Sequence, residues 1–423
     1  MNDKLKELAI NGGTPARKSS NPPMFPGGMI IDEREEQAVL EVLRSKRLFR
    51  YYGPGNSTSK VEEFENAFSK ETGVLYTLGL NSCTNALAVA LIAAGINPGD
   101  EVIVPAYTFV ASAAAIIAAN AIPVIVEVDE SLTIDPADIE RNITSKTKAI
   151  MPVHMRGVSC NMDAVLNIAQ KHGLKVIEDA AQANGGKYNG KPLGSMGDAG
   201  CFSFQFHKII TAGEGGAITT NDKRLLNRAK SLHDTGANWR EDKSIENKDE
   251  YPIFPGFNFR MTELTGAILL VQLQKREALI KTMQAHAARI EQAISEHSKA
   301  QLRKKNSPDG DVSVCRMFFV ESAAKAEEIA AALYAEGIPA ETMGHGLPDW
   351  HIYSHWRHII SRHGNNDAGY PFTLSDKKYS ADMCPRTISN LQRVIHIDVS
   401  PLLSHSDIDE TVEGLHKVLD RLL

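Results

Sequence analysis

A lysine that follows an apolar run is the first residue of this chain whose position suggests chemistry. Residues 199–205 predict a buried strand, and Lys208 comes three residues later, before the glycine-rich stretch Gly213-Glu-Gly-Gly216. Burial disfavours the charged form of a lysine, so it lowers the pKa and frees the amine as a nucleophile. Such an amine could form a Schiff base with an aldehyde cofactor. The alternative is an exposed lysine at the end of a strand.

Other polar and aromatic residues stand next to predicted strands and helices, where ligands often bind. Glu178 and Asp179 follow an apolar run, and a carboxylate there could pair with a protonated pyridine nitrogen, bind a metal or cap the next helix. The stretch Asn81-Ser-Cys-Thr84 precedes a helix, where hydroxyls and free N–H groups favour a phosphate or simply cap the helix. Tyr107 and Phe109 follow a further strand, and either could stack on a flat ring or pack in the core.

Two motif-like stretches do not support a site. The stretch from Gly185 to Lys191 has the spacing of a phosphate-binding P-loop, but Pro192 replaces the Ser or Thr that would hold magnesium. His351, His355 and His358 could share one helix face, yet no fourth ligand is evident, so we expect no metal. No G-x-G-x-x-G motif follows a strand, which argues against a nicotinamide or flavin oxidoreductase.

Strands that alternate with helices predict the fold class. Such alternation indicates βαβ units and a mostly parallel sheet, which binds ligands at the carboxyl ends of its strands. A long helix from about Thr262 to Glu296 leads to a second α/β unit, which includes an irregular segment over 344–384. We therefore expect an α/β fold with a large domain over residues 1–275 and a small C-terminal domain over 276–423. The strands of the large domain are expected at 101–105, 123–128, 148–153, 174–178, 199–205 and 216–220.

Composition indicates an ordinary globular chain. Hydrophobic residues make up 43% of the 423 residues, and the formal net charge of −6 gives no basic excess for nucleic acid. The five scattered cysteines favour a reducing cytoplasm without a disulfide framework. The uncharged stretch 102–126 is long enough to span a membrane, but Pro105, Asn120 and Pro123 divide it, so we expect a strand, a helix and a strand.

Four motifs occur together, and in order, in a known family. They are Phe202-Ser-Phe-x-x-x-Lys208-x-x-x-x-Gly-Glu-Gly-Gly216, Glu178-Asp-Ala-Ala-Gln182, Pro105-x-x-Thr-Phe-x-Ala111 and Phe257-Asn-x-Arg-Met261. With them the chain resembles the DegT/DnrJ/EryC1/StrS sugar aminotransferases, which have the aspartate-aminotransferase-like fold type I of pyridoxal 5′-phosphate (PLP) enzymes. The resemblance implies PLP as cofactor, transfer of an amino group from glutamate or glutamine to a keto-sugar, and a homodimer with shared active sites. It also implies a place in amino-sugar biosynthesis, such as that of lipopolysaccharide or another cell-surface polysaccharide.

The resemblance also assigns roles to single residues. Lys208 is expected to hold PLP covalently and to transfer the proton, and Asp179 is expected to pair with the pyridine nitrogen. Asn258 is expected to reach the phosphate in the neighbouring subunit's site. The other expected cofactor contacts are Gln182, Ser203, Cys83, Thr84 and Phe109, and the expected substrate contacts are Arg50, Tyr51, Tyr52, His207, Arg156 and His345.

Departures from the family pattern bear on the substrate. Arg156 stands where an apolar or aromatic residue is usual, and the stretch from Arg47 to Gly53 resembles the branch that holds the 3-amino-5-hydroxybenzoate synthases. An acidic eight-carbon keto-sugar, 8-oxo-3,8-dideoxy-manno-octulosonate, is one expected substrate. A PLP-dependent dehydratase or aromatising synthase of the same family and a non-catalytic partner subunit are the alternatives. Lys208 argues against the family's 3-dehydratases, which place His there, and against a non-catalytic partner.

Overall fold

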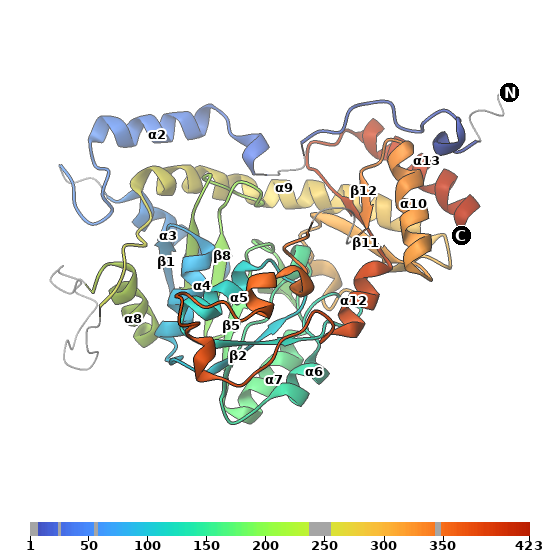
Figure 1. The fold of residues 1–423 in the computed structure, drawn as a ribbon. Coiled ribbons are helices and arrows are strands. Elements are labelled where there is room, and N and C mark those ends of the chain that lie inside the picture. Colours follow the sequence, from blue (N-terminus) through green and yellow to red (C-terminus); the bar gives the residue numbers. More distant parts are fainter. Residues whose placement is uncertain (1–6, 24–26, 55–57, 237–254, 343–347) are drawn as a thin grey trace.

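The chain builds two sheets and a long helix that runs past both of them. The computed structural model describes residues 7–23, 27–54, 58–236, 255–342 and 348–423. Helix α9 (Glu263–Ser295) has 33 residues, so it is about 50 Å long, and it lies against the large sheet at one end and the small sheet at the other (Figure 1). Among the described residues, no helix is both long and apolar enough to cross a membrane.

The large sheet has seven strands in the order β1-β9-β8-β5-β4-β2-β3. All of its strands run in one direction except β9, which is antiparallel to both of its neighbours. This confirms the predicted α/β fold with a mostly parallel sheet. The strands are β1 (Tyr76–Leu80), β2 (Glu101–Pro105), β3 (Ile122–Val126), β4 (Thr147–Ile150), β5 (Lys175–Asp179), β8 (Ala199–Ser203) and β9 (Gly216–Thr220).

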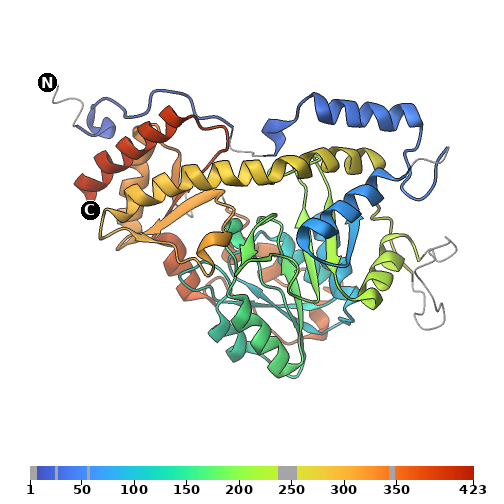
Figure 2. The ribbon, with the colours of Figure 1, turned by 180° about the vertical axis from the view of Figure 1, so that it is seen from behind.

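Helices cover both faces of this sheet, as the apolar strands require (Figures 1 and 2). Because side chains alternate along a strand, Val102 and Val104 of β2 belong to the buried cluster that includes α4, α5 and α8, while Ile103 belongs to the cluster that includes α6 and α7. On β8 and β9, the face of Phe202 and Ala217 packs against α3 and α9. These helices are α3 (Lys60–Thr72), α4 (Cys83–Ala93), α5 (Ala111–Ala118), α6 (Pro136–Asn142), α7 (Met162–His172) and α8 (Lys223–His233).

The small sheet is antiparallel, with the order β10-β11-β13-β12. Helices α10 and α13 pack with its apolar face and with the far end of α9. Helix α2 (Glu33–Ser45) lies along the other end of α9, beside the large sheet (Figure 1). The remaining elements of this part are β10 (Gln301–Leu302), β11 (Cys315–Phe319), α10 (Ala323–Ala335), β12 (Ala340–Thr342), β13 (Val394–Asp398) and α13 (His405–Leu422).

The irregular segment over 344–384 is rich in His and Trp, and its described residues, 348–384, pack on the large sheet. We expected this segment within the smaller unit. Three of its aromatic side chains, Tyr353, Trp356 and Phe372, are fully buried in the cluster that contains α4 and α5, whereas Trp350 is 47% exposed. The Tyr353 N–H donates to the Ala106 carbonyl at 3.0 Å, directly after β2. Burial of these aromatic rings on small-residue helices holds the segment in place. It contains α11 (Arg357–Ile360) and leads to α12 (Pro385–Gln392).

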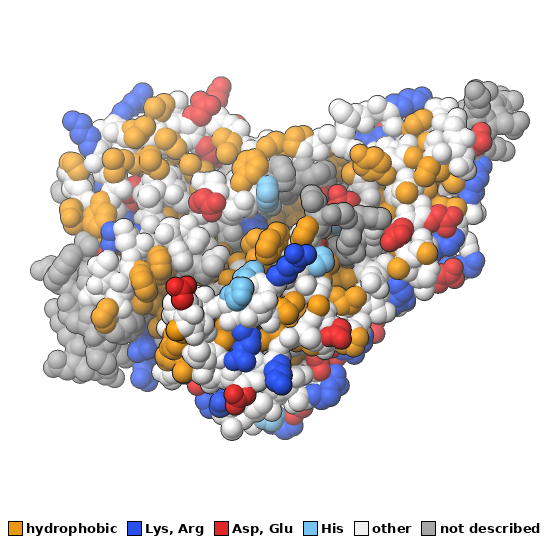
Figure 3. Space-filling view, in the orientation of Figure 1, with side chains coloured by type: hydrophobic (Ala, Val, Ile, Leu, Met, Phe, Trp, Pro, Cys, Tyr) orange, Lys and Arg blue, Asp and Glu red, His pale blue; other side chains and the backbone are white. Residues whose placement is uncertain are grey.

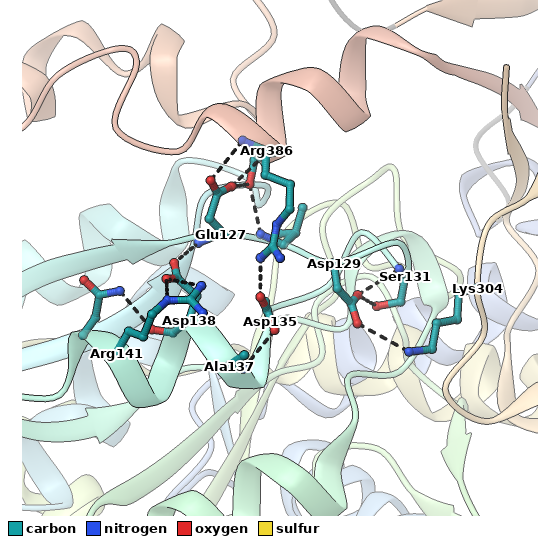
Figure 4. Close-up of polar contacts among 12 residues, drawn as sticks. Glu127, Asp129, Ser131, Asp135, Ala137, Asp138, Arg141, Lys304 and Arg386 are labelled. Carbon is teal, nitrogen blue, oxygen red and sulfur yellow. Dashed lines mark hydrogen bonds and ion pairs between the residues drawn. The ribbon is translucent and has the colours of Figure 1, made fainter. Parts of the chain in front are cut away.

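Acidic side chains after β3 fasten the start of α12 to the large sheet (Figure 4). The carboxylate of Glu127 accepts hydrogen bonds from the Arg386 N–H at 3.0 Å and from the Thr387 N–H at 2.7 Å. Arg386 also pairs with Asp135, and Asp138 accepts from the Glu127 N–H at 2.7 Å. These carboxylates have protein donors, and a carboxylate at a helix N-terminus is favourable. The cluster is therefore structural.

Three sequence expectations need comment. Strand β1 was not predicted, because Gly79 interrupts an already short run. The stretch from Gly185 to Lys191 with P-loop spacing forms a small hairpin of β6 (Lys187–Tyr188) and β7 (Lys191–Pro192). All five cysteines are buried and unpaired, and the described residues hold no group of three side chains placed to bind a metal.

Candidate active site

One cavity of about 440 Å³ opens at the carboxyl ends of the large sheet's strands. Its walls come from residues that directly follow or end β1, β2, β4, β5 and β8, and from the small sheet and the returning segment. This is the edge at which open α/β sheets bind ligands. The lining includes ten of the residues singled out in the sequence: Cys83, Thr84, Phe109, Arg156, Asp179, Gln182, Ser203, His207, Lys208 and the histidine at 351.

Lys208 lies on the turn after β8, and its side chain borders the cavity. The turn is held by backbone bonds, from the Lys208 N–H to the Gln205 carbonyl at 2.9 Å and from Phe206 to Gly213 at 3.0 Å. Burial lowers the pKa of the Lys208 amine, while its interactions with the Cys83 thiol and the Asp179 carboxylate act in the opposite direction. Among the described residues, its Nζ has no hydrogen-bond acceptor or ion-pair partner. The amine is therefore available as a nucleophile at lower pH than an exposed lysine.

Asp179 ends β5 as a buried carboxyl that still borders the cavity. Its Oδ2 accepts from the Ser112 hydroxyl at 2.7 Å, and its Oδ1 accepts from the Ala181 N–H at 3.0 Å. Burial raises the pKa of Asp179, while these two hydrogen bonds and the charge of Lys208 lower it. No described cation lies within ion-pair distance of this carboxylate. A cationic ring nitrogen brought into the cavity would therefore supply the positively charged partner that the Asp179 carboxylate lacks.

The N-terminus of α4 forms another wall. Ser82 caps the helix by accepting from the Asn85 N–H at 3.2 Å, and Cys83 and Thr84 are the first helical residues. Their N–H groups have no intrahelical acceptor, so this end suits an anion. A Cβ at Gly216 of β9 would lie 2.3 Å from the Ser82 backbone, so only glycine allows this close approach. Ser203 adds a hydroxyl from β8.

The aromatic pair after β2 separates into one core residue and one wall residue. Tyr107 is fully buried in a cluster of apolar side chains. Phe109 is 45% exposed, and its ring borders the cavity with its centroid 5.3 Å from that of His351. The ring of Phe109 is thus the one that can stack on a flat ligand.

Gln182 and Arg156 lie together on the wall after β4 and β5. The side-chain oxygen of Gln182 accepts from the Arg156 N–H at 3.0 Å, which fixes both residues. His207 also borders the cavity, and burial lowers the pKa of its ring.

Four of the proposed residues do not line the cavity within one chain. The Arg50 guanidinium binds the Glu65 carboxylate at 2.7 Å, and the Tyr51 hydroxyl contacts the His233 ring at 2.9 Å. Tyr52 is 68% exposed. Asn258 lies on the stretch beside Asp234. His345, the remaining substrate candidate, lies outside the described residues.

Several polar residues of the cavity received no ligand-contact role from the sequence, among them Ser112, His351 and Asp398. Ser112 sits in an alanine-rich helix and shows no local signal. His351 belongs to the set that we weighed only as metal ligands, and its Nδ1 lies 2.8 Å from Asp349. Asp398 ends β13 of the small sheet, and only the fold brings it to the cavity.

These residues match the needs of PLP. They offer a lysine amine with a lowered pKa, a buried carboxyl without a cation, a free helix N-terminus and an exposed aromatic ring. Each corresponds to one part of that cofactor: its aldehyde, pyridine nitrogen, phosphate and ring face.

Comparison with known proteins decides the family. The family model of the DegT/DnrJ/EryC1/StrS aminotransferases matches residues 29–356. The chain belongs to this family. It is 32% identical to the spore coat polysaccharide biosynthesis protein SpsC of Bacillus subtilis over 92% of this chain and 95% of SpsC. The predictions of an aminotransferase and of PLP as its cofactor are thereby confirmed.

Other relatives match parts of the chain. GDP-perosamine synthase of Caulobacter vibrioides is 47% identical over 51% of this chain, and the match spans 56% of that protein. The L-glutamine:2-deoxy-scyllo-inosose aminotransferase of Micromonospora echinospora is 36% identical, over 68% of each chain.

Two solved structures show the same fold. The 3-amino-5-hydroxybenzoic acid synthase structure has a TM-score of 0.77 and 26% identity, covering 96% of this chain and 100% of that one. NtdA of Bacillus subtilis, solved with the bound cofactor PMP, has a TM-score of 0.76 and 26% identity, covering 96% and 86%. PMP, pyridoxamine phosphate, is the aminated form of PLP. The likeness confirms the predicted fold type I.

Proposed function

We propose that this chain moves an amino group from glutamate or glutamine to the carbonyl of a keto-sugar, with Lys208 as the catalytic residue. The observation that carries the proposal is that the available amine of Lys208 and the buried carboxyl of Asp179 line the same cavity. Two relatives support the substrate class by their names, one as a GDP-perosamine synthase and one as an L-glutamine-dependent aminotransferase. SpsC supports a place in polysaccharide biosynthesis.

The residues divide the work as follows. When bound, PLP supplies an electrophilic carbon and a ring that withdraws electrons from the donor's Cα. Asp179 would hold the proton on the pyridine nitrogen, and Ser112 would orient its carboxylate. Phe109 would stack on one ring face. The N-terminus of α4, with Cys83, Thr84 and Ser203, would hold the phosphate.

Lys208 would serve twice at the same place. Its amine would first anchor the cofactor and, once the donor has displaced it, would take a proton from the donor's Cα and deliver it to the cofactor's carbon. The lowered pKa of Lys208 keeps part of the amine unprotonated and able to accept that proton. The same residue would run the steps in reverse on the keto-sugar.

A shared dimeric site is part of this proposal. Leu40 and Leu43 of α2, Leu48 and Tyr52 have exposed hydrophobic side chains, and so does Phe257, which precedes Asn258. Figure 3 shows hydrophobic side chains gathered over α2. A second copy that covers them would bury apolar surface, as dimer interfaces do. Asn258 and the Arg50–Tyr52 loop would then complete the partner's cavity.

The acceptor that we propose to test first is 8-oxo-3,8-dideoxy-manno-octulosonate. Its carboxylate would complement the cationic Arg156 on the cavity wall. The experiment supplies holoenzyme with glutamate labelled with ¹⁵N at the amino group and follows the label by mass spectrometry. Transfer of the label to the sugar supports the proposal, with Lys208→Ala as the inactive control. Loss of water from the sugar without ¹⁵N incorporation would favour the dehydratase or aromatising alternative.

A further inference from the structure

Arg156 presents a cation to the cavity without an acidic partner of its own. Its side chain lines the wall formed after β4. Its Nε is fully shielded from solvent and donates no hydrogen bond. No carboxylate of the described residues lies within ion-pair distance of its guanidinium. A buried N–H donor without an acceptor costs stability, and no carboxylate offsets that cost at Arg156.

The backbone holds Arg156 in an unusual conformation. Its φ of 54° and ψ of 33° place it in the left-handed region, which is uncommon for residues other than glycine. Its N–H donates to Gln182, and a Cβ on the following Gly157 would lie 2.3 Å from the Val312 side chain. The turn is therefore fixed from two sides, and the strained conformation aims the long side chain into the cavity. Strain that the surroundings enforce in this way is typical of ligand-binding positions.

The acidic residues near Arg156 pair with histidines and not with its guanidinium, which is therefore available to a ligand. Asp398 borders the same cavity, but its carboxylate already binds the His396 ring at 2.9 Å. Asp349 is likewise paired, with the Nδ1 of His351 at 2.8 Å. The Tyr107 hydroxyl accepts a hydrogen bond from the guanidinium, but burial raises the pKa of Tyr107, so this partner is neutral. Arg156 therefore keeps its positive charge without a neutralising ion pair.

We propose that Arg156 is the carboxylate-recognition residue of this cavity. Its planar guanidinium would bind a substrate carboxylate through parallel N–H donors, a geometry that a lysine cannot reproduce. The carboxylate could come from the amino donor or from an acidic keto-sugar, and both present the same chemistry. The inference rests on the proposed function, because both candidate ligands are substrates of that reaction.

The test uses PLP-loaded wild type, Arg156→Met and Arg156→Lys. Calorimetry measures the binding of glutarate, which has both carboxylates of glutamate but no amine to react. The first half-reaction is then followed by cofactor absorbance with glutamate, with glutamine, which lacks the γ-carboxylate, and with isoglutamine, which lacks the α-carboxylate. Arg289→Met serves as the matched control, because Arg289 pairs with Asp409 on the surface, away from the cavity.

The pattern of losses identifies the carboxylate. Removal of hydrogen bonds to a charged group predicts a rise of about 10- to 150-fold in the dissociation constant. A contact with the α-carboxylate predicts that Arg156→Met weakens glutamate and glutamine alike and spares isoglutamine, while a γ-contact spares glutamine. If Arg156 binds the carboxylate of the sugar, Arg156→Met should slow only the second half-reaction. It should slow that reaction with the octulosonate but not with the methyl ester of the octulosonate. Arg156→Lys should restore only part of the affinity in each case.

Two results would overturn the inference. The first is a folded Arg156→Met enzyme that binds glutarate, all three donors and the acidic sugar as well as wild type does. The second is a uniform loss for charged and neutral ligands, which would show a structural role. If wild type transaminates no donor, the proposed function fails, whereas glutarate binding still tests Arg156 independently.

Discussion

The buried pair of Glu178 and His154 makes a prediction whose size and pH dependence both follow from the structure. Both side chains have no exposed surface, and the Nε2 of His154 lies 3.1 Å from Glu178. The carboxylate also accepts from the N–H groups of Gly194, Met196 and Gly197 at 2.7–2.8 Å. In Glu178→Gln, one carboxylate oxygen becomes an N–H₂ group that faces donors. Breaking a buried pair of this kind costs about 3–5 kcal/mol of folding free energy.

The pH dependence has a definite sign. Burial by itself lowers the pKa of His154, but Cys160 and Glu178 raise it to about 10, above the unperturbed value of 6.5. The contribution of the pair to the free energy of unfolding is therefore fully present below pH 6.5 and is lost as the pH rises toward 10. Glu178→Gln removes the acid that raises this pKa. The stability gap between wild type and Glu178→Gln should be largest near pH 6 and should narrow by pH 9.5.

Urea unfolding of both proteins at pH 6 and pH 9.5, with PLP held constant, measures that gap. Glu140→Gln is the matched control, because its partners Lys171 and His172 are on the surface and exposed ion pairs contribute at most about 1 kcal/mol. A gap below 1 kcal/mol at pH 6, or one that is equal at both pH values, would refute the reasoning. The pair matters to the site because the backbone N–H of His154 donates to the backbone carbonyl of Asp179 at 3.0 Å.

Three further predictions concern single groups. Ser112→Ala removes the hydroxyl from Asp179, so PLP should bind about 5- to 10-fold more weakly by equilibrium dialysis, and unchanged affinity would contradict this role. Glu127→Gln disrupts the bonds to α12 and should lower the unfolding free energy by about 1–3 kcal/mol without changing PLP affinity, and a loss of PLP affinity would contradict the structural role. The rate of covalent PLP capture by the apoenzyme should rise with pH and reach its midpoint below 10.5, because burial lowers the pKa of Lys208, whereas a midpoint at or above 10.5 would show an unshifted amine.

The sequence allowed the large sheet to be predicted where its strands are uninterrupted apolar runs. β2, β3 and β9 stand within a residue or two of their expected positions. β1 was not visible, because Gly79 weakens its pattern, and the contacts that crowd this position are tertiary. A Cβ at Gly79 would lie 3.1 Å from the Met261 sulfur and 3.3 Å from Val61, residues distant in sequence. No local pattern contains that constraint.

The candidate site likewise contains residues that the sequence could predict and residues that it could not. Lys208 and Asp179 could be predicted because polar residues at the ends of buried strands are unusual and chemically meaningful. Ser112 and Asp398 could not, because the first resembles the small residues of a packed helix and the second comes from the other sheet. His351 reaches the cavity only because Tyr353 and Trp356 anchor its segment on the large sheet. Such contacts depend on the whole fold and leave no spacing signal.

We propose above all that Lys208 holds PLP and carries the amino-transfer chemistry. The most direct measurement is reduction of the PLP-loaded enzyme with borohydride, followed by peptide mass spectrometry, for wild type and Lys208→Ala, each with and without glutamate. We expect PLP fixed to Lys208 in wild type, loss of that label after glutamate, and no fixed label in Lys208→Ala. A label on another lysine, or a Lys208→Ala enzyme that still converts the cofactor with glutamate at the wild-type rate, would contradict it.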